Sequence, residues 1–563
     1  MGAYDHKRLE FDKVLSQLEA HCHYQSAKEL ARGLDVESDP HRLDVKLRET
    51  EAAMLCLQRF GSAPISAYNL VGTAIQRSMR ESQLSIKELM QIASFLRSIE
   101  NLQRYVDHDV ESYLASGLVD DEIVDYEPYL RYFHQLQSFP NLYARIDRSI
   151  ISEEEIADEA SPRLAQIRRQ IRDAQASIRN QLNSLIQRHA DDLSDRLYTQ
   201  RNGRFVLPLK ADRRGAIKGF IHDSSSSGQT VFIEPLQVFE TNNRLRELEG
   251  EEEEEIQAIL MHLSAEVADY GDLLLSQLGI ARDIDFIQAK ARLAVDMKAT
   301  RANINYQKQI VLEAARHPLI DPRLVVPIDI ELGRSFKTLI ITGPNTGGKT
   351  VALKTLGLLS LMGLSGLMIP AAAGSQIAYF EKILADIGDE QSIEQSLSTF
   401  SSHMKHLVEI SKQDLSEALL LIDELGSGTD PSEGAALAEA ILEDFRQSGA
   451  VCMASTHYRE LKIYAMEQAD VENACCEFDL ETLLPSYRLL IGVPGVSNAF
   501  VISKKLGLSD AVIDAAEAKL NQDTRKFERL LFGLEQDRKR SEEAQASLES
   551  ERKRLELAEA DFE

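Results

Sequence analysis

The chain has 563 residues, of which 44% are hydrophobic, 27% charged and 6% aromatic, with no tryptophan. That length predicts several domains, and the composition favours a helix-rich protein. The formal net charge of −27 excludes binding of nucleic acid over the whole surface, so contact with a polyanion would need a local basic patch.

No stretch of the sequence is apolar over the length of a membrane span, and the N-terminus has no charged-then-apolar leader. The five cysteines have no paired C-x-x-C spacing. Such cysteines are typical of reduced thiols, so we expect a cytoplasmic protein with no membrane partner.

The first half of the chain is predicted to be largely helical. Residues 1–155 have a helical pattern without a chemistry-bearing motif, and we expect an α-helical core or lever there. Residues 156–199 place apolar side chains at steps of three and four, which indicates a coiled-coil arm. Residues 236–300 are predicted to form a second arm and the return to the core. The acidic run Glu251–Glu255 in that arm is interpreted as a solvated helix face.

Between the two arms, residues 200–235 are rich in Gly, Ser, Val and Phe. Alternation in Arg204–Lys210 and in Gln229–Glu234 predicts strands, and therefore a β-rich tip. Positive charge gathers in this tip on Arg201, Arg204, Lys210, Arg213, Arg214 and Lys218. Such a patch suits a phosphate backbone, as in a nucleic-acid clamp. A solvated loop explains the same charges, and the sequence leaves both interpretations open.

Strand–helix alternation over residues 301–507 predicts an α/β domain. Within it, the buried-strand run Thr338–Thr342 is followed by a glycine-rich turn and then by a helix, the context of a P-loop. The loop residues are Gly343, Pro344, Asn345, Thr346, Gly347, Gly348, Lys349 and Thr350. Backbone N–H groups of such a turn point at phosphate oxygens. Lys349 would supply charge to the β- and γ-phosphates and Thr350 would bind Mg²⁺, so we expect ATP and Mg²⁺ as cofactors.

Two later strands supply residues that complete such a site. An apolar strand from Leu419 ends in Asp423 and Glu424, and the carboxyl end of a parallel strand lies beside the phosphate loop. We expect Asp423 to hold Mg²⁺ through water and Glu424 to polarise the attacking water. A third apolar strand delivers His457, which would contact the γ-phosphate. The set predicts an ATPase with Glu424, Lys349 and His457 as its catalytic residues.

Three short motifs flank these strands, namely Ser398-Thr399-Phe400, Glu424-Leu425-Gly426-Ser427-Gly428-Thr429-Asp430 and Ser455-Thr456-His457. Together they resemble the ATPase domain of the MutS family, a group of ABC-class ATPases. The resemblance implies a homodimer in which two such domains pair head to tail. It also implies that Ser398 contacts, in trans, the γ-phosphate bound to the partner. An ordinary helix N-cap at Ser398 explains the same residues.

Further segments are similar to the second, mismatch-independent branch of that family, MutS type II. They are Ser227–Pro235, Ala315–Ile320 and Ser401–Met404, the last of which replaces the family's usual glutamate. The stretch from Arg316 to Ile320 is also a candidate neighbour of the adenine. The Phe-x-Glu sequence Phe232-Ile233-Glu234 is interpreted as a strand and not as a mismatch wedge.

The two ends of the chain support the same branch. The sequence enters helices almost at once, which leaves no room for the N-terminal reading domain of mismatch-repair members. Residues 508–563 are predicted to be truncated C-terminal helices. Full-length members continue into KOW and Smr nuclease domains that do not follow Glu563, so we expect no nuclease activity from this chain.

The resemblance implies one ATP-driven clamp with two alternative substrates. In the first, the dimer engages the rRNA of stalled or collided ribosomes and splits them into subunits. In the second, it binds branched DNA such as Holliday junctions and suppresses recombination. We favour the ribosome because, without a reading domain, the chain shows no evident element for sensing a DNA sequence. A scaffold with a vestigial ATP site is disfavoured, since the motif set is intact.

Overall fold

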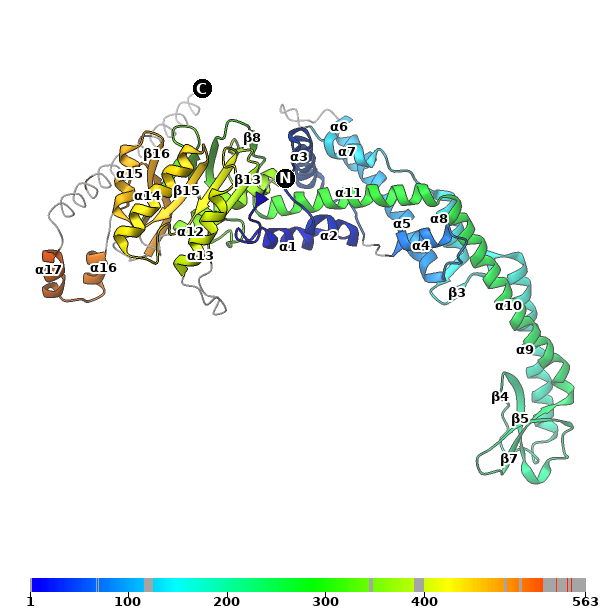
Figure 1. The fold of residues 1–563 in the computed structure, drawn as a ribbon. Helices are drawn as coiled ribbons and strands as arrows, with labels where there is room; N and C mark the ends of the chain where they lie inside the picture. Colours follow the sequence, from blue (N-terminus) through cyan, green and yellow to red (C-terminus); the bar gives the residue numbers. More distant parts are fainter. Residues whose placement is uncertain are drawn as a thin grey trace, which may run out of the picture. The chain divides into compact units, whose positions relative to one another are not determined.

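The computed structural model describes residues 3–66, 68, 70–115, 125–343, 348–388, 399–479, 484–495 and 499–519, with 533, 544 and 548 (Figure 1). The chain divides into two compact units. The first comprises Met1–Ser62, Ser116–Arg131 and Ile284–Glu563, and the second comprises Ala63–Ala115 and Tyr132–Asp283. The sequence predicts six segments, a finer division than these two units, and the bounds of those segments stay a prediction.

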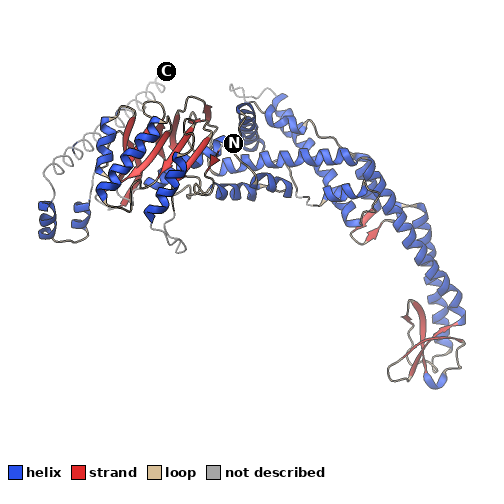
Figure 2. Cartoon of the chain, viewed as in Figure 1, coloured by secondary structure: helices blue, strands red, loops and turns tan. Residues whose placement is uncertain are grey.

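The first unit is built on a seven-stranded sheet with helices packed against it (Figure 2). Its strands, in spatial order, are β1 (Ala3–Tyr4), β13 (Lys382–Asp386), β14 (Ala418–Ile422), β15 (Val451–Thr456), β11 (Thr338–Thr342), β16 (Val471–Asp479) and β17 (Leu484–Ile491). All neighbours are parallel except β16 and β17. Strands β11, β14 and β15 are buried at every position, as expected for continuous apolar runs inside a parallel sheet.

Helices cover this sheet and give it its core. They are α12 (Lys349–Leu364), α13 (Thr399–Ser411), α14 (Pro431–Gln447) and α15 (Arg459–Glu467). One apolar cluster joins α13, α14 and α15 to the central strands, with Leu407, Leu442 and Leu461 packed near Leu420 and Ile340. Because β11, β14 and β15 are held in register by this core, their carboxyl ends meet at one edge of the sheet.

The first unit also contains a second sheet and further helices. A second sheet contains β10 (Ile328–Leu332), β9 (Ile310–Ala315), β12 (Gln376–Ala378) and β8 (Asn303–Asn305). The further helices include α1 (Phe11–His21), α2 (Gln25–Arg32), α3 (Pro40–Phe60), α16 (Ala499–Lys505) and α17 (Asp510–Lys519), while α7 (Glu127–Phe133) and α11 (Gly271–Asp296) contribute to both units. The helical pattern of the N-terminal residues gave no sign that β1 pairs with β13, because a two-residue strand has no periodicity to detect.

The second unit contains a long helix pair and a small antiparallel sheet. Its helices include α4 (Val71–Ser78), α5 (Ile86–Arg104), α8 (Pro140–Ser149), α9 (Pro162–Arg188) and α10 (Leu236–Asp269). The sheet order is β4 (Thr199–Arg201), β5 (Arg204–Lys210), β7 (Thr230–Pro235) and β6 (Gly219–Ser224). Helices α9 and α10 run side by side (Figure 1). Ile178, Leu182 and Leu185 of the predicted stripe are buried against β5 and β7.

The acidic run Glu251–Glu255 of α10 is not simply a solvated face. Glu252 accepts a hydrogen bond from Arg168 of α9 at 2.7 Å, and Glu255 accepts one from Ser161 at 2.6 Å. The earlier interpretation was wrong for these two side chains, because the facing helix presents an arginine and a serine that the local sequence does not reveal. Among the helices that the structure describes, none is long and apolar enough to cross a membrane.

Candidate functional site

The glycine-rich turn follows β11 and leads into α12, as predicted. Gly343 and Gly348 have φ of 127° and 98°, values in the left-handed region that favours glycine. Pro344, Asn345, Thr346 and Gly347 lie outside the described residues. Lys349 is the first residue of α12 and is 2% exposed. Its Nζ donates to the carbonyl oxygen of Gly343 at 2.8 Å, which holds the amine beside the loop.

Two predicted magnesium ligands lie in direct contact. The Thr350 hydroxyl donates to Oδ2 of Asp423 at 2.5 Å, and the Ser455 hydroxyl donates to Oδ1 of the same carboxylate. Asp423 is only 9% exposed. A hydroxyl and a carboxylate are hard oxygen ligands of the kind that Mg²⁺ prefers, so the pair fits that ion.

Glu424 adopts a backbone conformation that non-glycine residues rarely take. Its φ is 51°, and its N–H donates to the Ser455 hydroxyl at 2.9 Å. Leu425 then donates to the Ser455 carbonyl at 3.0 Å, so β15 stabilises the turn. Strained residues of this type cluster at functional sites, where the surrounding structure holds them. The turn keeps Glu424 at the carboxyl end of β14, next to Asp423.

His457 follows β15 at the same edge of the sheet. Partial burial, and then the charge of Lys349, lower the pKa of its imidazole, while Glu424 opposes the shift. Burial also lowers the pKa of Lys349, against the charges of Asp423 and Glu424. Lys349, Glu424 and His457, predicted from the ends of three separate strands, are therefore close enough to influence one another's charge. Ser398, by contrast, lies outside the described residues.

Sequence reasoning missed a second carboxylate behind the magnesium ligands. Asp386 ends β13, is 4% exposed and accepts hydrogen bonds from Nδ1 of His403 at 2.9 Å and Nδ1 of His406 at 3.0 Å. Burial opposes ionisation, but these two hydrogen bonds prevail and lower the pKa of Asp386. Its backbone oxygen accepts the N–H of Asp423 at 2.9 Å. His403 belongs to the segment Ser401–Met404, which replaces the family's usual glutamate, so this segment anchors α13 to the sheet. The sequence signal that could have indicated Asp386 was an apolar strand, Lys382–Asp386, that ends in an acidic residue.

Asp386→Ala is expected to destabilise the first unit by about 3 kcal/mol, because it removes a buried carboxylate that accepts hydrogen bonds from two partly buried imidazoles. Calorimetry should show a lower unfolding midpoint. Glu409→Ala, an exposed acidic side chain on the same helix, serves as the matched control and should leave the midpoint unchanged. Equal midpoints for the two variants would show that Asp386 does not anchor α13.

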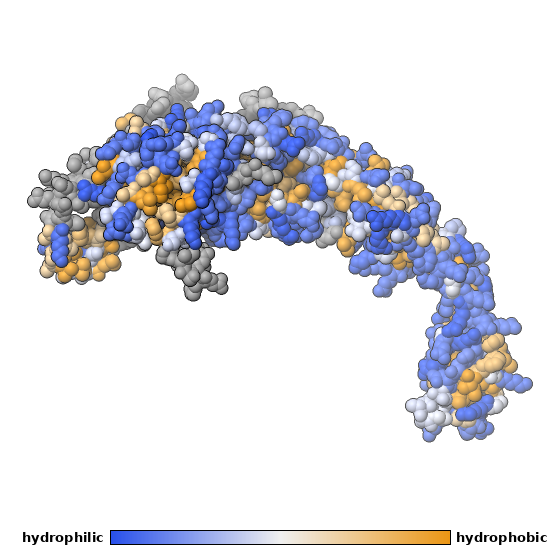
Figure 3. Space-filling model, in the orientation of Figure 1, coloured by the Kyte–Doolittle hydropathy of each residue, from blue (hydrophilic) through white to orange (hydrophobic). Residues whose placement is uncertain are grey.

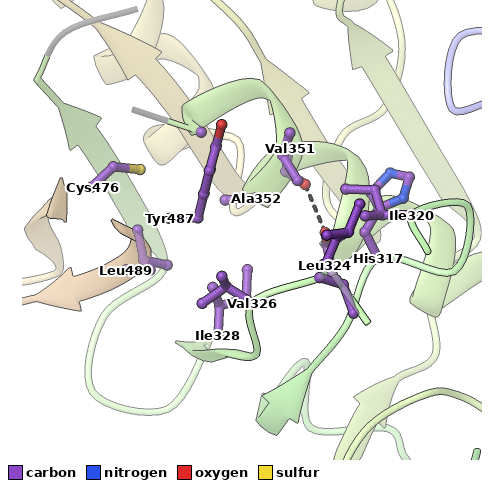
Figure 4. Close-up of a pocket in the computed structure, with 13 residues that line it drawn as sticks. His317, Ile320, Leu324, Val326, Ile328, Val351, Ala352, Cys476, Tyr487 and Leu489 are labelled. Carbon is purple, nitrogen blue, oxygen red and sulfur yellow. Dashed lines mark hydrogen bonds between the residues drawn. The ribbon is translucent and has the colours of Figure 1, made fainter. Parts of the chain in front are cut away.

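A mostly apolar cavity of about 310 Å³ adjoins Gly348 (Figure 4). Its lining residues are His317, Ile320, Leu324, Val325, Val326, Ile328, Gly348, Val351, Ala352, Thr355, Cys476, Tyr487 and Leu489. The side chains of β16 and β17 face those of α12 and of the segment before β10 across it. Its size, its apolar walls and its place beside the phosphate loop suit the base of a nucleotide.

The residues of this cavity only partly match the stretch expected to neighbour adenine. His317 and Ile320 line it, whereas the Arg316 guanidinium donates to the Lys298 carbonyl at 2.7 Å. Burial lowers the pKa of His317 to about 4, so its imidazole is neutral at physiological pH. Tyr487 on β17 was missed, because nothing in its local sequence indicates contact with a loop more than a hundred residues away.

The six cations expected on the tip do not share one environment. Arg204 donates to Glu234, which is 0% exposed, at 2.8 Å, so this arginine is committed to the interior of the sheet. Arg201 lies over the ring of Phe232 at 4.3 Å. The Lys210 amine donates to the Asp191 carbonyl at 2.8 Å. The exposed cations are Lys210, Arg213, Arg214 and Lys218. The prediction that Arg204 contacts a nucleic-acid backbone therefore has no structural support.

Comparison with known proteins agrees with the motifs. A family model described as MutS domain V matches residues 339–523. Endonuclease MutS2 of Ruminiclostridium cellulolyticum is 45% identical over 537 residues, which are 95% of this chain and 66% of that protein. Endonuclease MutS2 of Acetivibrio thermocellus is 46% identical over 531 residues, 94% of this chain and 66% of that protein.

The chain thus spans about two thirds of the length of these relatives. Their names include "endonuclease", which is partly at odds with the expectation of no nuclease activity, and that expectation stays a prediction. The similarity extends over nearly the whole chain and includes the domain that holds Lys349, Asp423 and Glu424. The chain therefore belongs to the MutS family, in its MutS2 branch.

Proposed function

We propose that this chain is a Mg²⁺-dependent ATPase of the ABC type, and that two copies form a clamp that acts on ribosomes. The main support for ATPase activity is that Lys349, Thr350 and Asp423 lie together at one edge of the sheet, beside Glu424. Each of these groups has a role in phosphoryl transfer to water, and a purely structural site would not need all of them.

The residues divide the work as follows. Lys349 exchanges its bond with the Gly343 carbonyl for the β- and γ-phosphates of ATP. Thr350 would hold Mg²⁺ with its hydroxyl and Asp423 would help to hold it through water, and the ion would neutralise charge on the phosphates. Glu424 orients the attacking water and accepts its proton. Partial burial lowers the pKa of His457, and in this proposal its neutral imidazole would donate a hydrogen bond to the γ-phosphate.

In the proposed homodimer, each copy contributes a residue to the nucleotide site of the other. In this proposal Ser398, immediately before α13, contacts ATP bound to the partner. The Asp386 contacts with His403 and His406 then link that helix to the strand carrying Asp423. ATP binding would close the dimer, and hydrolysis would release it. The five cysteines are buried thiols outside any disulfide bond, which suits a reducing cytoplasm.

We infer that the β4–β7 sheet is the tip of the clamp and contacts rRNA in stalled or collided ribosomes. Exposed Arg213, Arg214 and Lys218 support contact with a phosphate backbone. Branched DNA is the alternative substrate, and it is favoured by one observation, the name "endonuclease" carried by the relatives. Both substrates present the same backbone chemistry, so binding experiments must separate them.

The double variant Arg213→Glu and Arg214→Glu should weaken binding to ribosomes or nucleic acid by about tenfold or more, because two attractive charges become repulsive. Binding is measured by fluorescence anisotropy at fixed salt. Arg80→Glu with Lys87→Glu makes the same change of charge at exposed positions outside the tip and is the matched control. Equal affinity of the two double variants would mean that Arg213 and Arg214 belong only to a solvated loop.

A further inference from the structure

An apolar patch is exposed on the β4–β7 sheet, next to its cations (Figure 3). Phe220 is 49% exposed, Ile221 52% and Leu236 51%. The first two belong to β6, an edge strand of the sheet, and Leu236 begins α10. Phe220 and Ile221 are consecutive in β6 and point to opposite faces of the sheet, so the patch considered below is formed by Phe220 and Leu236. An exposed aromatic ring with an exposed apolar neighbour is typical of an interaction surface.

The patch rests on a fixed base. The ring of Phe220 lies 4.9 Å from that of Phe239, centroid to centroid. At Gly219, a Cβ atom would lie 2.1 Å from the Glu234 carbonyl oxygen. Only glycine therefore permits the close approach of β6 to β7 at this position. A β-bulge between Ile221 and Asp223 follows. Bulges are common where a strand re-aims a side chain for function.

The carboxylate beneath the patch is fully neutralised. Glu234 accepts hydrogen bonds from Arg204 at 2.8 Å, from His222 at 2.6 Å and from Asn242 at 2.7 Å. It therefore presents no free negative charge to a ligand on this face. These three hydrogen bonds, made to a carboxylate that is 0% exposed, also fix β6, β7 and α10 relative to one another, so the surface is preorganised.

A second aromatic ring belongs to the same face. Cross-strand partners share a face of a sheet, and Phe220 pairs with Glu234. Phe232, two residues before Glu234 on β7, therefore lies on that face as well. Arg201 covers its ring at 4.3 Å. Aromatic rings beside stacked guanidinium groups are typical of surfaces that bind the flat faces of unpaired bases.

The charge around the patch identifies an anionic partner. Residues 200–235 hold six cations, the six named for the tip, against three acids, Asp212, Asp223 and the buried Glu234. Lys218 is adjacent to the patch, since its carbonyl accepts the N–H of Leu236 at 2.9 Å. A second copy of this positive tip would be repelled. A duplex would offer its backbone but not its stacked bases.

We propose that the Phe220 patch, formed by Phe220 and Leu236, stacks unpaired nucleobases while the neighbouring cations hold the backbone. The inference rests on the proposed nucleic-acid contact of the tip and narrows its substrate to strands or loops with accessible bases. Such loops occur in folded RNA and at open DNA junctions, and the base faces are chemically alike in the two.

The test measures anisotropy of the full chain with three labelled probes: a polyuridine strand, an abasic strand of the same length, and a blunt duplex. The wild type should bind polyuridine most tightly. Phe220→Leu should lose about tenfold in affinity for polyuridine and match the abasic strand, because stacking is lost while packing on Phe239 is kept. Phe220→Trp should retain the preference. A polythymidine strand shows whether the surface distinguishes DNA from RNA.

Equal wild-type affinity for the polyuridine and abasic strands would overturn stacking while leaving the backbone contact intact. Unchanged polyuridine binding by Phe220→Leu would do the same. Failure of the wild type to bind any probe would overturn both stacking and the nucleic-acid role of the tip. If Phe220→Leu instead abolishes self-association in sedimentation and leaves polyuridine binding unchanged, the patch is a contact between copies, and stacking is again refuted.

Discussion

Glu424→Gln is expected to bind ATP about as tightly as the wild type and to hydrolyse it at least about a hundredfold more slowly. The amide keeps the size of the side chain and cannot accept a proton from water. The left-handed backbone at this residue, with φ of 51°, and its bond to Ser455 do not depend on the carboxylate, so the loop should keep its geometry. The expected state is a dimer trapped with ATP.

Phosphate release in a single turnover measures the chemical step directly, and nucleotide affinity is measured separately by calorimetry. Glu439→Gln, an exposed glutamate on α14, is the matched control and should hydrolyse ATP normally. Wild-type turnover by Glu424→Gln would remove Glu424 from its role as the base.

Lys349→Ala should weaken ATP binding by about a hundredfold or more, because it removes a buried positive charge held against the phosphate loop. Lys349→Met retains most of the apolar side chain and should show the same loss, which separates the effect of charge from that of packing. Lys337→Ala, at the opposite end of β11, removes an exposed lysine and should bind ATP normally. Unchanged affinity for both Lys349 variants in calorimetry would contradict the phosphate-loop assignment.

The sequence predicted those parts of the fold that have strong local signals. The run Thr338–Thr342 is a strand with the expected bounds, and the apolar strand expected before His457 is β15, because buried parallel strands are continuous apolar segments. The position of Asp423 and Glu424 beside the phosphate loop could also be predicted, because parallel strands bring their carboxyl ends to one edge of the sheet. Arg204–Lys210 is also a strand, as its alternation indicated.

The features that could not be predicted depend on partners far away in the chain. The Asp386 contact with His403 and His406, and the place of Tyr487 in the base-sized cavity, arise only when separate strands are assembled. Likewise, Arg204 has the composition of a nucleic-acid contact, but its ion pair with Glu234, thirty residues away, decides that it is structural. Charge counted along a sequence does not distinguish paired side chains from available ones.

The central claim, a clamp that ATP closes on ribosomes, is tested most directly by sedimentation. Glu424→Gln is incubated with ATP and Mg²⁺ and run on a gradient with ribosomes from cells in which translation has been stalled. We predict that the trapped protein migrates with the ribosomes and that the Arg213→Glu, Arg214→Glu changes release it. Trapped protein that stays at the top of the gradient while it shifts four-way DNA junctions would contradict the ribosome as substrate.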